Sequence, residues 1–197
     1  LSSRTSTLID TLWHGINGHS PVDGQMKSLV DLFIRIDSKV VCNYAYLIPH
    51  SSIRMEVMGI TQREASSVEL ATMVSIVRQL MEEGAVGLST GLTYWPECFT
   101  PTNELIQLCR TVAQYGGIYV THLRDYGEGI INAIEEAIFI GNQAEIPVHI
   151  SHLCCDDEGV IHLIDNARLE GLNVTFDLYP YLAGNTLLVQ FLPQSIY

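Results

Sequence analysis

The stretch Gly117–Leu153, GIYVTHLRDYGEGIINAIEEAIFIGNQAEIPVHISHL, decides the fold. It begins and ends with short runs rich in β-branched and aromatic residues, which are typical of strands. Between these runs, apolar residues recur at the spacing of one helix face, at Ile130, Ile134, Ala137 and Ile138. A strand, a helix and a second strand in direct succession predict a βαβ unit, in which the two strands pair in parallel through a right-handed crossover.

The same unit repeats along the chain. Strand-like runs lie at residues 39–47, 85–89, 117–122, 147–153 and 173–179, and helical patterns lie at 67–83, 101–115, 127–144 and 159–170. The centres of the last four strands are about thirty residues apart, which is the length of a βαβ unit. The repetition predicts one parallel sheet, either open and doubly wound or closed as a (β/α)₈ barrel.

Helix boundaries follow from capping residues. Thr100-Pro101 with Glu104 predicts an N-cap and a capping box for the helix over 101–115. Glycines at the predicted helix ends are expected to stop the helices, and these are Gly84, Gly116, Gly141 and Gly171.

Polar, reactive side chains gather where the last three strands end. These are Thr121-His122, Ser151-His152, and Asp177 with Tyr179. Because the carboxyl ends of parallel strands meet on one side of a barrel, this pattern is typical of a barrel active site. The chain contains no glycine-rich dinucleotide motif and no P-loop, which a doubly wound sheet would favour. We therefore predict a partial (β/α)₈ barrel.

His122 and His152 are the candidate metal ligands. They end adjacent predicted strands and lie thirty residues apart. Neighbouring strands are about 4.8 Å apart and Zn–N bonds are about 2.0–2.1 Å, so two such imidazoles can share one ion. The alternative is that they are rim histidines bonded to the backbone. His149 is expected to point to the opposite face, and His50 either lines the mouth of the site or is structural.

Composition excludes several classes of function. The 197 residues are 47% hydrophobic and carry 22 acidic against 10 basic side chains, for a net charge of −12. This balance argues against nucleic acid and anionic membranes as partners. No apolar run is long enough to span a membrane and no signal peptide is evident, so a cytoplasmic protein is expected. The five cysteines show neither a disulfide framework nor a zinc ribbon.

The ends and the strand count indicate a piece of a longer protein. The chain opens on Leu1, stops at Tyr197 just after an apolar segment, and holds five predicted βα units where a barrel needs eight. We expect a lead segment with a helix over residues 1–38 and an incomplete barrel over 39–197.

Several blocks, in order, resemble one known family. They are GAVGLSTGLTY at 84–94, TNELI at 102–106, YGGIY at 115–119, THLR at 121–124, EEA at 135–137, IG at 140–141, IPV at 146–148, ISHL at 150–153 and DLYPY at 177–181. Together they resemble the D-aminoacylase (N-acyl-D-amino-acid deacylase) branch of the amidohydrolase superfamily, over about residues 40–193.

The resemblance implies a zinc-dependent hydrolase, with one or two ions, that cleaves the amide of small N-acyl-D-amino acids. The chain would supply strands 3 to 7 of the metal-dependent hydrolase barrel. His122 and His152 match the family's zinc ligands on the fifth and sixth strands. Tyr179 and Arg124 match substrate-holding positions, because such groups can bind a substrate carboxylate. The family's catalytic aspartate has no counterpart in this chain.

Departures from the family leave alternatives open. Cys154 stands where the family has a lysine that binds the substrate carboxylate, and the stretch with Asn185 replaces a serine-rich one. Both positions are expected to contact substrate. The family's His-x-His pair and cysteine ligand are also missing, so the 197 residues alone are expected to hydrolyse substrate negligibly. The alternatives are an inactive remnant of the enzyme, or a related amidohydrolase of the N-acyl-D-glutamate deacylase or dihydroorotase-like kind. A cysteine nucleophile at Cys154-Cys155 is a weaker alternative.

Overall fold

The computed structural model of the chain describes residues 2–17, 28–155, 157–184 and 186. The helices are α1 (Ser3–Asn17), α2 (Leu29–Ile36), α3 (His50–Met58), α4 (Ser67–Glu82), α5 (Thr102–Ala113), α6 (Ile130–Ala144) and α7 (Glu158–Leu169), with a short 3₁₀-helix, η1 (Glu97–Phe99). The strands are β1 (Leu47–Pro49), β2 (Gly87–Gly91), β3 (Ile118–His122), β4 (Val148–Ile150) and β5 (Val174–Phe176).

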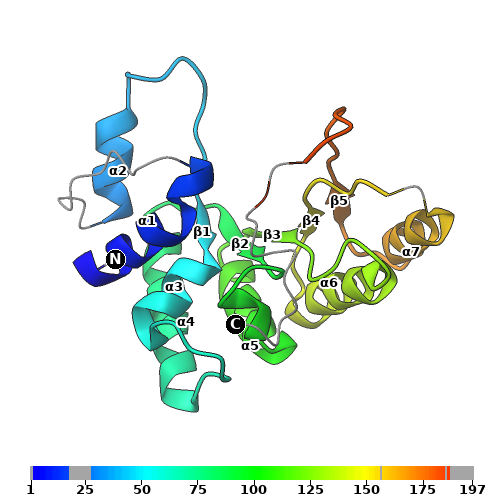
Figure 1. Ribbon diagram of the computed structural model, residues 1–197, viewed down its shortest axis with the longest axis horizontal. Coiled ribbons are helices and arrows are strands. Elements are labelled where there is room, and N and C mark those ends of the chain that lie inside the picture. The colour runs from blue at the N-terminus through cyan, green and yellow to red at the C-terminus, as the bar shows by residue number, and fades with distance from the viewer. Residues whose placement is uncertain (1, 18–27, 156, 185, 187–197) are drawn as a thin grey trace.

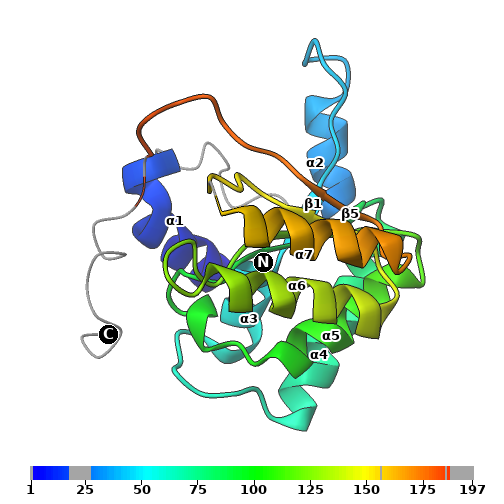
Figure 2. The ribbon, with the colours of Figure 1, turned by 90° about the vertical axis from the view of Figure 1, so that its right-hand side faces the viewer.

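The five strands form one parallel sheet in the order β1-β2-β3-β4-β5. Helices connect each strand to the next, and α3 to α7 cover one face of the sheet (Figure 1). Figure 2 shows α4, α5, α6 and α7 side by side in chain order. Consecutive parallel strands with helices on a single face are the arrangement of part of a (β/α)₈ barrel. The predicted partial barrel is confirmed.

The core lies between the sheet and this layer of helices. Leu88, Tyr119 and Val148 from three successive strands are fully buried, as are Leu108 of α5 and Ile140 of α6. Burial alternates along β3, where Tyr119 and Thr121 are buried and the other three residues are half-buried. Because side chains alternate between the faces of a strand, His122 lies on the face that the helices leave uncovered.

The first strand, predicted over residues 39–47, is misplaced. Residues 39–46 form no strand, and β1 begins only at Leu47, which pairs with Gly87 of β2. Val40, Val41 and Tyr44 are exposed, so their side chains pack against no neighbouring strand. β-branched residues stabilise a strand only through such packing, which explains why composition alone misplaced it.

Three of the four glycines predicted to stop helices do so. Gly84, Gly116 and Gly171 follow α4, α5 and α7 with φ of +106°, +69° and +101°, a conformation that costs glycine little. Gly141 is instead inside α6, which ends at Ala144 and is followed by Glu145 with a φ of +52°. The prediction for Gly141 is wrong because this glycine is required where α6 packs against Val148 of β4.

The lead segment contacts the remainder of the chain at both of its described helices. Near α1, the backbone nitrogen and hydroxyl of Ser2 donate to the Glu56 carboxylate at 2.9 and 3.0 Å. In α2, the Leu29 backbone nitrogen donates to Glu83 at 2.7 Å. Within the ranges that the structure describes, every helix is too short or too polar to cross a lipid bilayer.

Candidate metal and substrate site

The two predicted metal ligands meet at the carboxyl end of the sheet. His122 is the last residue of β3, and His152 follows β4 in a turn with a φ of +40°. Nδ1 of His122 lies 3.0 Å from Nε2 of His152. The structure therefore brings together the pair that the strand-end pattern selected.

The geometry and charge of the pair suit a metal ion. Two Zn–N bonds of about 2.0–2.1 Å at a tetrahedral angle place their nitrogens roughly 3.3 Å apart, close to the separation found here. Burial and the neighbouring His152 lower the pKa of His122 to about 4, so its imidazole is neutral at pH 7, as ligation requires. Within the described ranges, however, no group of three or more His, Cys, Asp or Glu side chains is placed to hold an ion. The pair fits as half of a ligand set.

Tyrosine rings surround the two imidazoles. The ring centroids of Tyr94 and Tyr126 lie 4.9 and 4.8 Å from that of His122, and Tyr179 lies 6.3 Å from His152. The Tyr126 hydroxyl accepts the Leu123 backbone N–H and donates to the Ser151 carbonyl, both at 2.9 Å. Tyr126 thus ties the end of β3 to the end of β4 and restricts how far the two histidines can separate.

Asp177 and His149 lie beside the pair. His149 is hydrogen-bonded at both ring nitrogens, through Nδ1 to the Thr175 hydroxyl and through Nε2 to Asp177, each at 2.8 Å. The other oxygen of Asp177 accepts the His152 backbone N–H at 2.6 Å. These hydrogen bonds lower the pKa of Asp177. The sequence predicted that His149 points away from His152, on the assumption that both lie in one strand. Because β4 ends at Ile150, His152 is outside the strand and this alternation does not apply to it.

The predicted substrate residues divide into two groups. The exposed Cys154 lies close to the hydroxyl of Tyr179, and its proximity raises the pKa of that hydroxyl. Both therefore lie next to His152, and contact with substrate stays a prediction for them. Asn185 lies outside the described residues.

The Arg124 guanidinium forms hydrogen bonds within the chain. Its Nε and Nη2 donate to the Glu136 carboxylate at 2.8 and 2.9 Å. Nη1 and Nη2 also donate to the carbonyls of Cys98 and Thr100, each at 3.0 Å. In this structure the guanidinium fastens the segment before α5 to α6, and its predicted role toward a substrate carboxylate stays a prediction.

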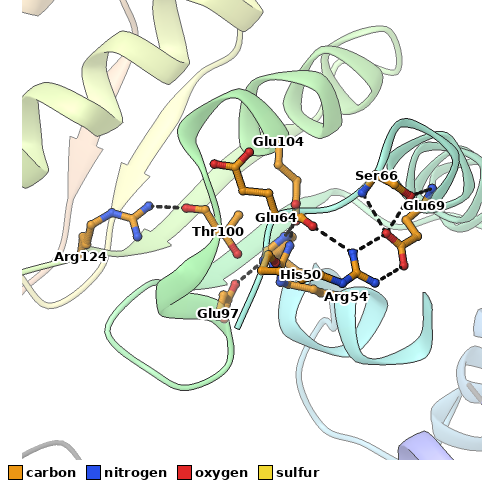
Figure 3. A network of polar contacts seen from close by, with 10 residues as sticks. His50, Arg54, Glu64, Ser66, Glu69, Glu97, Thr100, Glu104 and Arg124 are labelled. Carbon is orange, nitrogen blue, oxygen red and sulfur yellow. Dashed lines mark hydrogen bonds and ion pairs between the residues drawn. The ribbon is translucent and has the colours of Figure 1, made fainter. Parts of the chain in front are cut away.

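A buried ionic network lies at the start of α3 and α5 (Figure 3). His50 lies between two carboxylates, with Nδ1 2.7 Å from Glu97 and Nε2 2.9 Å from Glu104. Arg54 donates to the second oxygen of Glu104 at 2.5 Å. All four side chains are at most 4% exposed. His50 is therefore structural and does not line the mouth of the site.

The network corrects the predicted capping box. The N-cap of α5 is Pro101, whose side chain cannot accept a hydrogen bond, and the Glu104 carboxylate is bonded to His50 and Arg54, so neither half of a capping box forms. Burial alone would lower the pKa of His50, but the hydrogen bonds to Glu104 and Glu97 outweigh it and raise the pKa to about 9. Burial raises the pKa of Glu104, and His50 and Arg54 more than offset it. His50 is thus a buried cation at neutral pH.

Sequence reasoning missed three residues of the site. Thr93 and Tyr94 lie two and three residues after the end of β2, and Tyr126 lies four residues after the end of β3, yet all three contact His122. Their position after strand ends was the available signal, because active sites of barrels are built from those loops.

Comparisons with known proteins give the site a context. The chain is 39% identical over 155 residues to the D-aminoacylase of Alcaligenes xylosoxydans xylosoxydans. It is 33% and 30% identical to the N-acyl-D-aspartate and N-acyl-D-glutamate deacylases of that organism. These matches cover 75–77% of this chain and 32% of each relative. The chain spans about a third of the length of the curated relatives and is homologous to them there. No protein-family model matches it.

Solved structures agree with the sequence matches. A crystal structure of D-aminoacylase, assigned to a novel subset of amidohydrolases, is 34% identical with a TM-score of 0.74 over 80% of this chain and 35% of that one. The N-acyl-D-glutamate deacylase of Bordetella bronchiseptica, solved with zinc and a phosphonate inhibitor, is 28% identical with a TM-score of 0.76 over 82% and 36%. Another D-aminoacylase structure concerns a binuclear metal centre.

Proposed function

We propose that this chain is part of a zinc-dependent hydrolase that removes the acyl group from small N-acyl-D-amino acids, with His122 and His152 as two of its metal ligands. The observation that carries the proposal is the 3.0 Å approach of His122 Nδ1 to His152 Nε2 at the carboxyl end of a parallel sheet. Homology to deacylases that act on D-amino-acid derivatives supports the reaction and the substrate class.

The residues of the chain would serve this reaction in distinct ways. A zinc ion held by the two imidazoles would supply Lewis-acid catalysis of amide hydrolysis. Tyr126 holds the two strand ends together, and Asp177 orients the backbone of His152. Tyr179 and Cys154 lie beside His152, where a substrate held for reaction would meet them.

Metal binding tests the first part of the proposal. Equilibrium dialysis with Zn²⁺ should show one ion bound whose affinity falls at least tenfold in His122→Ala and in His152→Ala. His162→Ala is the matched control, because His162 is an exposed histidine on α7. Equal zinc affinity in all four proteins would overturn the assignment of the ligands.

A graft tests the reaction itself. This chain's matched segment would replace the homologous segment of the Alcaligenes D-aminoacylase, which supplies the remaining two thirds of the barrel enzyme. We expect zinc-dependent release of D-amino acids from N-acetyl-D-amino acids, lost with His152→Ala and retained with His162→Ala. Equal activity on the L-enantiomers would contradict the substrate class.

A second candidate function is that of an inactive relative, and Cys154 favours it. A cysteine stands where the resembled family has a lysine for the substrate carboxylate, and it lies beside Tyr179. In this case the graft would fold and bind zinc without hydrolysing substrate. Restoration of activity by Cys154→Lys in the same graft would locate the defect at this position.

A further inference from the structure

The loop from residues 92 to 101, which joins β2 to α5, reaches the first histidine of the pair. The Leu92 backbone N–H donates to the His122 carbonyl at 3.1 Å, and the Thr93 hydroxyl oxygen lies 2.9 Å from His122 Nε2. Tyr94 adds a ring contact to the same imidazole. His122 is therefore held from one side by three consecutive residues of this loop.

The two nitrogens of His122 have different neighbours. Nδ1 faces His152 Nε2, and Nε2 faces Thr93. A neutral imidazole carries a single N–H, and a nitrogen that binds a metal must offer its lone pair. If Nδ1 is the ligating nitrogen, the hydrogen is on Nε2, and the Thr93 oxygen is placed to accept it.

We propose that Thr93 is a positioning residue of the metal site, which accepts the Nε2–H of His122 and so keeps Nδ1 as the nitrogen that faces His152 and the metal. This inference rests on the proposed function, because it takes His122 to be a ligand. Partners of this kind fix the ring orientation and the tautomer of metal-binding histidines, and their loss typically weakens metal affinity about 10- to 100-fold.

Thr93 can act in this way because the part of its loop that follows it, from Glu97 to Thr100, is fastened from two sides. On one side, Glu97 of η1 is bonded to the buried His50 at 2.7 Å. On the other, Arg124 donates to the carbonyls of Cys98 and Thr100, each at 3.0 Å. A hydroxyl on a loop fixed by two charged anchors has little freedom to leave the imidazole.

The experiment compares Thr93→Val with Thr93→Ser in the full chain. Valine keeps the shape and removes the hydroxyl, whereas serine keeps the hydroxyl. We expect Thr93→Val to weaken Zn²⁺ binding about 10- to 100-fold, measured by competition with a chromophoric chelator, and Thr93→Ser to bind Zn²⁺ within about threefold of wild type. In the zinc-loaded chain, ¹⁵N–¹H NMR of the His122 ring should show the hydrogen on Nε2 in wild type and in the serine variant.

Unfolding of the metal-free proteins distinguishes an effect on the metal site from a general loss of stability. Without metal, Thr93→Val should still unfold cooperatively, with a midpoint lowered only slightly by the loss of one part-buried hydrogen bond, so that weaker zinc binding is not caused by a misfolded chain. Thr72→Val is the control, because Thr72 is an exposed threonine on α4 whose hydroxyl donates to the Val68 carbonyl of the same helix. If wild type binds zinc through His122 and His152 and Thr93→Val binds it equally well, the role of Thr93 is refuted while the proposed function stands. If wild type shows no zinc binding through these histidines, both are refuted.

Discussion

His50 joins the start of α3 to two later elements of the chain. It begins α3, and its partners Glu97 and Glu104 lie 47 and 54 residues further on, in η1 and α5. The ring is fully buried, so the two carboxylates replace water as its hydrogen-bond partners. Through Glu97 the same ring fastens the loop that carries Thr93 to His122. His50 therefore influences the geometry of His122 although it is not a predicted metal ligand.

Removing this cation should destabilise the chain strongly. In His50→Gln the side chain can still bond one neighbour, but Glu97 and Glu104 lose the buried charge between them. We expect the free energy of unfolding to fall by about 3–5 kcal/mol, as for other broken buried ion pairs. Urea unfolding followed by circular dichroism measures it, with His162→Gln as an exposed control. A loss below about 1 kcal/mol would contradict this view of the network.

The raised pKa of His50 also predicts how stability depends on pH. The folded pKa is about 9, and the unfolded pKa is about 6.5. The folded state therefore binds the proton more tightly, and this contribution is complete below about pH 6.5 and is lost as the pH rises through 9. We expect wild type to lose on the order of 3 kcal/mol more than His50→Gln over this range. Parallel profiles for the two proteins would show that His50 is neutral when folded.

At the scale of elements, helix α6 shows how closely the helices approach the sheet. A Cβ added at Gly141 would lie 2.5 Å from Cγ2 of Val148 on β4 and 3.1 Å from Leu172. Glycine allows α6 to pack directly against β4, the strand that precedes His152. The glycine is needed for contact between two elements, and nothing in the local sequence distinguishes it from a helix-ending glycine.

Gly141→Ala separates packing from helix propensity. Propensity alone would stabilise α6 by up to about 1 kcal/mol, whereas the overlap with Val148 should cost about 1–3 kcal/mol. We expect net destabilisation in thermal unfolding. In a Val148→Ala background the 2.5 Å overlap is removed and only the contact with the flexible end of Leu172 remains, so the same substitution should destabilise the chain much less. Equal effects in both backgrounds would show that the contact is unimportant.

Elements with strong periodic patterns were predicted well. The helices expected over 67–83 and 159–170 occur as α4 (Ser67–Glu82) and α7 (Glu158–Leu169), because an apolar stripe at helical spacing needs only a covering sheet to be buried. Short elements were predicted less well. Helix α3, which follows β1 without a break, was not predicted. A three-residue strand such as β1 exists through its pairing with β2, which a local pattern cannot reveal.

At the scale of the whole molecule, charge is the dominant feature. The 22 acidic and 10 basic side chains leave a net charge of −12, and some of the basic side chains form ion pairs. Arg54 and Arg124 are bound to Glu104 and Glu136. Repulsion among the remaining carboxylates opposes the compact state.

Added salt should therefore stabilise the chain. Between about 0.01 and 0.15 M NaCl the screening length falls from about 30 to about 8 Å, which weakens the repulsion among exposed carboxylates while the buried pairs change little. We expect the thermal unfolding midpoint to rise by a few degrees over this range. Scanning calorimetry at constant pH measures it, and a falling midpoint would show that surface ion pairs outweigh the repulsion.

The sequence by itself determined the repeated βα order, the parallel sheet and the two histidines at its carboxyl edge. These follow from periodicity and from the strand-end position of polar residues, which are properties of neighbours along the chain. Only the tertiary structure decided that Glu104 bonds His50 and Arg54 rather than capping α5, that Arg124 holds a loop, and that Thr93 meets His122. The physical reason is that the partner of a side chain depends on which distant residues burial brings within hydrogen-bond distance, and no local pattern carries that information.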